Sequence, residues 1–167
     1  TLTANVGAWD GVAALAFTYA WSRCDATGAC AAIPDATAPR YTTGVDDVGR
    51  TIVVAVSASK GGSAATTASS SATTAIAPAN TVLPSFGSST MVGATLTATP
   101  GTWTASADTT YAYEWQRCDA ALASCTAVDT SQSHVIAAAD VGFVLRVAVT
   151  ATANGGSTTA TSAASAG

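Results

Sequence analysis

The sequence has little charge and no long apolar run, and each shortage excludes a class of protein. Charged residues make up 10% of its 167 positions, against about 25% in an average globular domain. Its net charge is −4, and because nucleic-acid binding needs a basic patch, we expect no nucleic-acid partner. No apolar stretch approaches the roughly 18 residues of a spanning helix, so we expect no membrane span.

Residues that commonly carry catalysis are equally scarce. His134 is the only histidine, and no Gly-x-Ser-x-Gly motif surrounds a serine. The adjacent carboxylates are Asp46 and Asp47, and neighbouring side chains of an extended chain point apart. The sequence also lacks the Asp-x-Asp-x-Asp-Gly pattern of a calcium loop. We therefore expect no enzyme, no metal site and no cofactor.

What the sequence does contain is a long internal repeat. Thr1–Ala4 and Trp9 match Thr95–Ala98 and Trp103, 94 residues further on. A Tyr-x-Trp-x-Arg-Cys-Asp motif begins at Tyr19 and returns at the same offset. A period this long is that of a domain, since roughly 50 to 200 residues hold an independent core.

The repeat predicts two domains of unequal extent. We expect domain 1 at residues 1–76, a short linker at 77–80 and domain 2 at 81–167. Residues 81–87 form an extra leading strand in domain 2, and no counterpart precedes Thr1. Two interpretations stay open. The missing strand lies outside this segment of a longer array, or a strand from another subunit fills the open edge of domain 1.

Alternating apolar residues predict β-strands throughout. Ile52, Val54 and Val56 share one face of a predicted strand, and the same pattern returns 93 residues later. Several short strands separated by Gly- and Asp-rich turns indicate an all-β fold of sandwich type. The Ala- and Thr-rich stretch 63–76 follows a turn signal, so we expect it to be a final strand of domain 1.

Each copy carries two cysteines at matching positions, Cys24 and Cys30 in the first and Cys118 and Cys125 in the second. Four cysteines allow three pairings, and the repeat favours one local disulfide in each copy. The alternative is a metal site, which needs the cysteines of two domains to meet, and no histidine stands near them. Because disulfides form in oxidising compartments, we expect an extracellular or cell-surface protein.

Together these motifs resemble a known family. Gly-x-Trp, Tyr-x-Trp-x-Arg-Cys-Asp, a second cysteine, Asp-Val-Gly and an alternating Leu/Ile-x-Val-x-Val strand are similar to bacterial Ig-like tandem repeats. Such repeats belong to large secreted surface proteins of high-GC Gram-positive bacteria. The resemblance implies two tandem immunoglobulin-like β-sandwich domains, the first lacking its leading strand. It departs from antibody domains because no late-strand cysteine bridges the sheets.

Four tryptophans are predicted to be structural. Trp21 and Trp115 lie mid-strand, where they should face the core. Trp9 and Trp103 stand beside turns, where they should close one end of each sandwich. The alternative for the last two is an exposed platform for a sugar.

Strand alternation also predicts two ion pairs. Arg23 and Arg117 lie two residues after the core tryptophans and lean the same way. Asp47 and Asp140 stand at the turn into the long strand, so Arg23–Asp47 and Arg117–Asp140 would clamp the two sheets. The alternative is that each Asp caps its own turn while each Arg extends into solvent.

No single site in the sequence points to a function, so our expectation about function rests on the family resemblance. It implies a structural or adhesive module of an extracellular fibre, stalk or filament, whose partners are neighbouring copies of the same module or subunit. One alternative is a carbohydrate- or protein-binding accessory module with a surface glycan or protein ligand, and another is a phage or virion decoration domain. His134 aligns with Tyr41 in the repeat, so we expect it on a strand surface and not as a general base.

Overall fold

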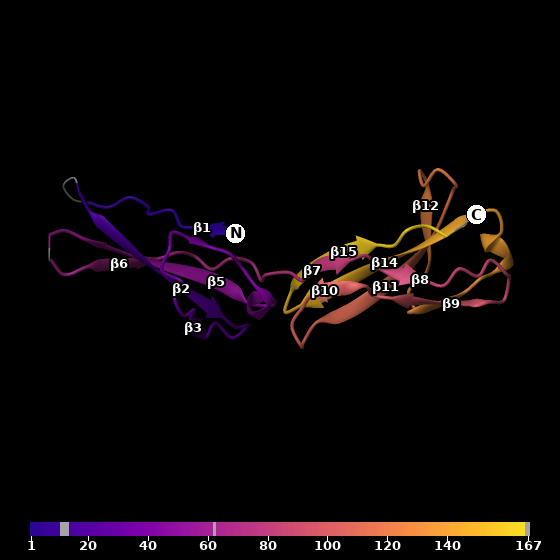
Figure 1. Cartoon of the computed structure of the whole chain (residues 1–167), viewed down its shortest axis with the longest axis horizontal. Helices are drawn as coiled ribbons and strands as arrows, with labels where there is room; N and C mark the ends of the chain where they lie inside the picture. Colours follow the sequence, from indigo (N-terminus) through magenta and orange to yellow (C-terminus); the bar gives the residue numbers. More distant parts are fainter. Residues whose placement is uncertain (11–13, 62, 166–167) are drawn as a thin grey trace. The chain divides into compact units, whose positions relative to one another are not determined.

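The computed structural model describes residues 1–10, 14–61 and 63–165, which form an all-β protein with no α-helix in these ranges (Figure 1). The chain divides into two compact units, Thr1–Ile76 and Ala77–Gly167. Antiparallel sheets in each unit are consistent with a β-sandwich. Within the described part of the chain, no helix has the length and apolarity needed to cross a membrane.

The described residues of the first unit form one four-stranded and one two-stranded sheet. The larger sheet has the order β3-β2-β5-β6, and β1 pairs with β4 in the smaller one. A 3-10 turn, η1, lies between β4 and β5. The elements are β1 (Leu2–Thr3), β2 (Ala16–Cys24), β3 (Cys30–Ala32), β4 (Arg40–Tyr41), η1 (Val45–Asp47), β5 (Thr51–Ser59) and β6 (Thr66–Ser69).

The second unit repeats this plan and adds strands to it. Its order β12-β11-β14-β15 matches the larger sheet of the first unit strand for strand. The sheet β13-β9-β8 matches β4-β1 and extends it by β8, and β7 pairs with β10. The elements are β7 (Ala79–Val82), β8 (Ser85–Phe86), β9 (Thr95–Thr99), β10 (Thr102–Thr104), β11 (Thr110–Cys118), β12 (Cys125–Asp129), β13 (Ser133–Val135), η2 (Ala138–Asp140), β14 (Val144–Ala153) and β15 (Gly156–Thr161).

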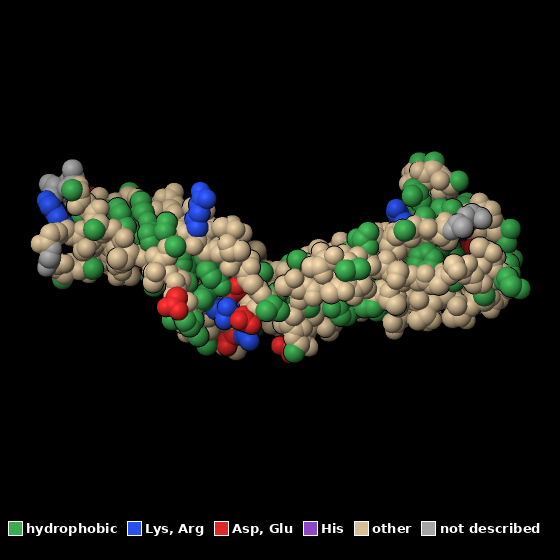
Figure 2. All heavy atoms as spheres, viewed as in Figure 1, with side chains coloured by type: hydrophobic (Ala, Val, Ile, Leu, Met, Phe, Trp, Pro, Cys, Tyr) green, Lys and Arg blue, Asp and Glu red, His purple; other side chains and the backbone are tan. Residues whose placement is uncertain are grey.

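Strands β5 and β14 bury every second side chain, as the alternation predicts. Ile52, Val54 and Val56 are 1–6% exposed, and Val147 and Val149 are fully buried. The side chains between them are partly exposed. β-Branched residues suit such half-buried strands because they pack well on a pleated surface. Charged residues make up 10% of the sequence, and accordingly few charged side chains are visible on the face shown in Figure 2.

The structure corrects the predicted linker at 77–80. Strand β7 already begins at Ala79, and Pro78 is buried. Asn80 is paired with Trp103 of β10, so these residues belong to the second unit. The leading strand is split into β7 and β8 on either side of Pro84, because proline has no N–H for a sheet ladder.

The predicted final strand of the first unit is shorter than expected. Of the stretch 63–76, only Thr66–Ser69 forms β6. Beyond it the chain still follows β5, since the N–H of Ser70 donates to Val54 and the N–H of Thr73 donates to Ile52. Thr and Ser side chains then replace part of the ladder by bonding to the β5 backbone.

Candidate functional site

Each unit buries one carboxylate just before its long inner strand. Asp47 ends η1 and is 0% exposed, and Asp140 ends η2 and is 5% exposed. The N–H of Gly44 donates to Oδ2 of Asp47 at 2.7 Å, and the N–H of Ala137 donates to Oδ2 of Asp140 at 2.8 Å. Each carboxylate therefore fixes its 3-10 turn by satisfying a backbone donor that the turn leaves unpaired.

In the first unit this carboxylate joins both sheets. Arg23 of β2 donates Nε–H to Oδ1 of Asp47 at 2.8 Å. Tyr41 of β4 donates its hydroxyl proton to Oδ2 of Asp47, also at 2.8 Å. One ionised group thus links β2, β4 and η1 by charge-assisted hydrogen bonds, which are stronger than neutral ones. We call this arrangement the carboxylate clamp.

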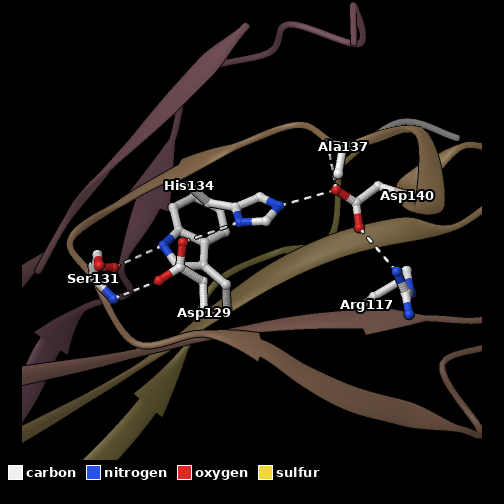
Figure 3. Close-up of polar contacts among 7 residues, drawn as sticks. Arg117, Asp129, Ser131, His134, Ala137 and Asp140 are labelled. Carbon is white, nitrogen blue, oxygen red and sulfur yellow. Dashed lines mark hydrogen bonds and ion pairs between the residues drawn. The ribbon is translucent and has the colours of Figure 1, made fainter. Parts of the chain in front are cut away.

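The second unit builds the same carboxylate clamp from a different set of side chains (Figure 3). Nη1 of Arg117 lies 3.4 Å from Oδ1 of Asp140 and 3.1 Å from the carbonyl oxygen of Ala139. Nε2 of His134 lies 3.0 Å from Oδ2 of Asp140. The Arg117 guanidinium also lies over the Phe143 ring, 5.3 Å from its centroid. The arginine is therefore shared among three neighbours.

His134 is a buried member of this clamp, and its expected place on a strand surface is wrong. The residue is 6% exposed, and its ring lies 5.6 Å from that of Trp115. Nδ1 faces Oδ2 of Asp129 at 3.3 Å, so both ring nitrogens meet carboxylates. Tyr41 replaces histidine in the first unit because both side chains bring a polar hydrogen to the same carboxylate oxygen from a flat ring.

The surroundings of both clamp carboxylates set their ionisation. Burial by itself raises the pKa of Asp47, but the hydrogen bonds from Gly44, Arg23 and Tyr41 outweigh it, and the pKa lies below its usual value. Burial likewise raises the pKa of Asp140, whereas its backbone donor, its histidine and the charge of its arginine bring the net pKa below the usual value. Both groups are ionised at neutral pH and act as acceptors.

One residue after each clamp arginine, a disulfide closes a hairpin. Cys24 is bonded to Cys30 across β2 and β3, and Cys118 is bonded to Cys125 across β11 and β12. These are the local pairings that the repeat predicts. Each disulfide fixes the strand that carries the arginine, and it does so at the residue next to the clamp.

An aspartate after the first cysteine organises each hairpin turn. Asp25 accepts the N–H groups of Thr27 and Ala29 at 2.9 and 3.0 Å. The hydrogen bond from the Thr27 hydroxyl is the main cause of the lowered pKa of Asp25. Asp119 accepts the N–H groups of Ala123 and Ser124 in the second hairpin. Such carboxylate-to-backbone bonds are typical of turns that begin with Asp.

All four tryptophans lie in the hydrophobic cores or pack against them. Trp21 and Trp115 are 4% and 0% exposed, and Trp103 is 9% exposed. Trp9 is half-buried and packs against the core of its unit. Trp9 and Trp103 each donate the indole N–H to the carbonyl three residues earlier. Both rings therefore close a turn at the sheet end instead of forming an exposed platform.

The structure brings together both predicted Arg–Asp pairs and both predicted cysteine pairs. The sequence reasoning missed Tyr41 and His134 as clamp members, although each precedes its aspartate by six residues. In the described residues every buried side-chain nitrogen and oxygen has a hydrogen-bond partner, and no three His, Cys, Asp or Glu gather to hold a metal. Comparisons with protein-family models, curated proteins and solved structures found no match to this chain.

Proposed function

We propose that this chain is a pair of structural modules, two tandem immunoglobulin-like β-sandwich domains, from an extracellular surface fibre, stalk or filament. The observation that carries the proposal is the carboxylate clamp, which recurs in both units at the same position of the repeat. Its hydrogen bonds connect strands of both sheets within a unit. A module that transmits force needs such connections.

The placement of the disulfides supports the same role. Each disulfide adjoins the strand end that carries the clamp arginine, so the covalent and the charge-assisted connections act on one strand. Disulfides persist in oxidising surroundings, which supports an extracellular location. The low charge leaves few groups for recognising charged ligands, so neighbouring copies of the module are the partners that fit best.

The tryptophans argue against the accessory sugar-binding alternative. A sugar platform needs exposed aromatic faces, but Trp103 is 9% exposed and Trp9 packs on the core. Both indole N–H groups are already bonded within their own turns. These two tryptophans are thus committed to the fold.

Single-molecule force spectroscopy on the full chain tests the proposal. Each unit should unfold in its own discrete step, and reduction should lengthen both steps because the residues enclosed by each disulfide then extend as well. Smooth extension at low force would contradict a load-bearing role. Saturable binding of a polysaccharide, with a change in tryptophan fluorescence, would replace the proposal by the accessory-module alternative.

A further inference from the structure

A tight turn joins β14 to β15, which run side by side in the second unit (Figure 1). Ala153 ends β14 and pairs with Gly156, the first residue of β15. Only Asn154 and Gly155 lie between the two strands, and their φ values are 44° and 89°. Asparagine followed by glycine is a preferred pair for such a turn, because both residues accept this left-handed backbone. The geometry of the hairpin thus accounts for the Asn-Gly dipeptide.

The same dipeptide brings two groups together that react with each other. The backbone nitrogen of Gly155 attacks Cγ of Asn154, and the C–N bond of the side-chain amide breaks. The proton lost by the attacking nitrogen goes to the departing group, which leaves as ammonia, and a cyclic imide remains. Water then opens either carbonyl of the imide to give aspartate or isoaspartate. This reaction is one reason why asparagine counts as a thermolabile residue.

The structure leaves both reacting groups accessible. Asn154 and Gly155 are exposed to solvent. Across the described part of the chain, no hydrogen bond holds the Asn154 side chain or the N–H of Gly155. A Cβ on Gly155 would meet no described heavy atom within 4 Å, so there is room around the attacking nitrogen. The described surroundings of the turn therefore neither cover these groups nor hold them apart.

The other two asparagines of the sequence lack these features. Asn5 precedes Val6, and its side-chain oxygen accepts a backbone N–H at 2.9 Å. Asn80 precedes Thr81, and its side-chain nitrogen donates to two backbone carbonyls at 2.8 and 3.2 Å. A β-branched neighbour places two heavy atoms on the Cβ beside the attacking nitrogen. Both asparagines therefore serve as internal comparisons for Asn154.

The two products of the reaction differ in what they do to the turn. Aspartate keeps the length of the main chain and tolerates a left-handed backbone, as asparagine does. Isoaspartate adds one carbon to the main chain of a two-residue turn. Because turn length fixes the register of a hairpin, the pairing of β15 with β14 should loosen. Strand β15 lies at the edge of its sheet, where β14 is its ladder partner.

We propose that Asn154 is a site of spontaneous modification, at which the second unit converts to an isoaspartyl form whose edge strand β15 is loosened. The first unit has Lys60 at the equivalent repeat position, which carries no amide. The reaction requires only this turn and water, so the inference does not depend on the proposed structural role. The second unit thus has a limited chemical lifetime that is set by its own turn.

Ageing the intact, oxidised chain in isotope-labelled water tests the site. Peptide mapping by mass spectrometry should find labelled OH in place of NH2 at Asn154 at least about tenfold faster than at Asn5 or Asn80, since glycine has no Cβ to crowd the attacking nitrogen. Isoaspartate should appear there as a second peptide of the same mass that elutes separately. The variant Asn154→Gly keeps a residue that accepts positive φ and should take up no label in the turn.

Hydrogen exchange tests the structural consequence. In the isolated isoaspartyl form, the amides of Ser157 to Thr161 should exchange at least about tenfold faster than in the fresh chain, while those of β6 stay unchanged. Freshly purified Asn154→Asp adds the charge without the extra carbon and should exchange like the fresh chain. Equal rates at the three asparagines, or reaction at Asn154 only after unfolding in urea, would overturn the site. Unchanged β15 exchange in the isoaspartyl form would overturn the loosening.

Discussion

Tyr41 donates a hydrogen bond to the fully buried carboxylate of Asp47 at 2.8 Å. In the second unit a histidine makes the equivalent bond, so one repeat position accepts two chemically different side chains with the same task. Removing the hydroxyl by Tyr41→Phe should lower the free energy of unfolding of the first unit by about 1–2 kcal/mol. The second unit offers the matched comparison, in which His134→Tyr should cost less than His134→Ala. Urea denaturation of the three variants and of the wild-type chain checks this, and equal losses for Tyr and Ala at position 134 would contradict the shared role.

The lowered carboxylate pKa values predict a stability that depends on pH. An unfolded aspartate titrates near 3.8, and Asp47 and Asp140 have lower pKa values in the folded chain. Their contribution is therefore complete above about pH 4 to 5 and is lost as the pH falls through the folded pKa values. Denaturation midpoints measured from pH 7 to pH 2 should show this fall.

The variant Asp47→Asn provides the control for that pH dependence. It should lower the stability of the first unit at pH 7 and flatten its acid response, while the second unit keeps its own. Hydrogen exchange of the β5 and β14 amides reports the two units separately. An unchanged acid response of the first unit in this variant would show that another group causes it.

The disulfides should contribute to stability as short covalent loops. Replacing both Cys24 and Cys30 by Ser should destabilise the first unit by about 2 kcal/mol, because a loop of this size restricts the unfolded chain by that amount. The equivalent replacement of Cys118 and Cys125 should have a similar effect on the second unit. Thermal unfolding of each double variant, compared with the oxidised wild-type chain, measures the loss. Stability that does not change on reduction would contradict a structural role for these bonds.

Val48 and Val141 occupy equivalent positions but differ in what covers them. Val48 is 4% exposed and forms a parallel β-bridge with Ile76, which accepts the N–H of Gly49 and donates its own N–H to the carbonyl oxygen of Arg50. Val141 is 66% exposed. Val48→Ala should therefore cost about 1–2 kcal/mol of stability, whereas Val141→Ala should stay within about 0.5 kcal/mol. Chemical denaturation of both variants checks the contrast, and equal effects would show that Ile76 does not act as a cover.

Some of these features follow from local sequence, and others depend on tertiary contacts. The inner face of β5 and the cysteine pairs are predictable because alternation and repeat position specify them directly. The roles of Tyr41 and His134 are not, since polar strand residues ordinarily face solvent. Only a buried carboxylate on a neighbouring turn reverses that preference. Likewise, Ala79 and Asn80 have little intrinsic preference for β-strands. They form a strand because they pair with β10.

The force needed to unfold the first unit tests the load-bearing role of the carboxylate clamp most directly. Asp47→Ala removes the buried acceptor, while Asp46→Ala alters the exposed carboxylate beside it and serves as the matched control. Pulling on each full-length variant should show the first unit unfolding at clearly lower force with Asp47→Ala and at wild-type force with Asp46→Ala. The second unit should be unaffected in both. Equal unfolding forces for the two variants would contradict the account.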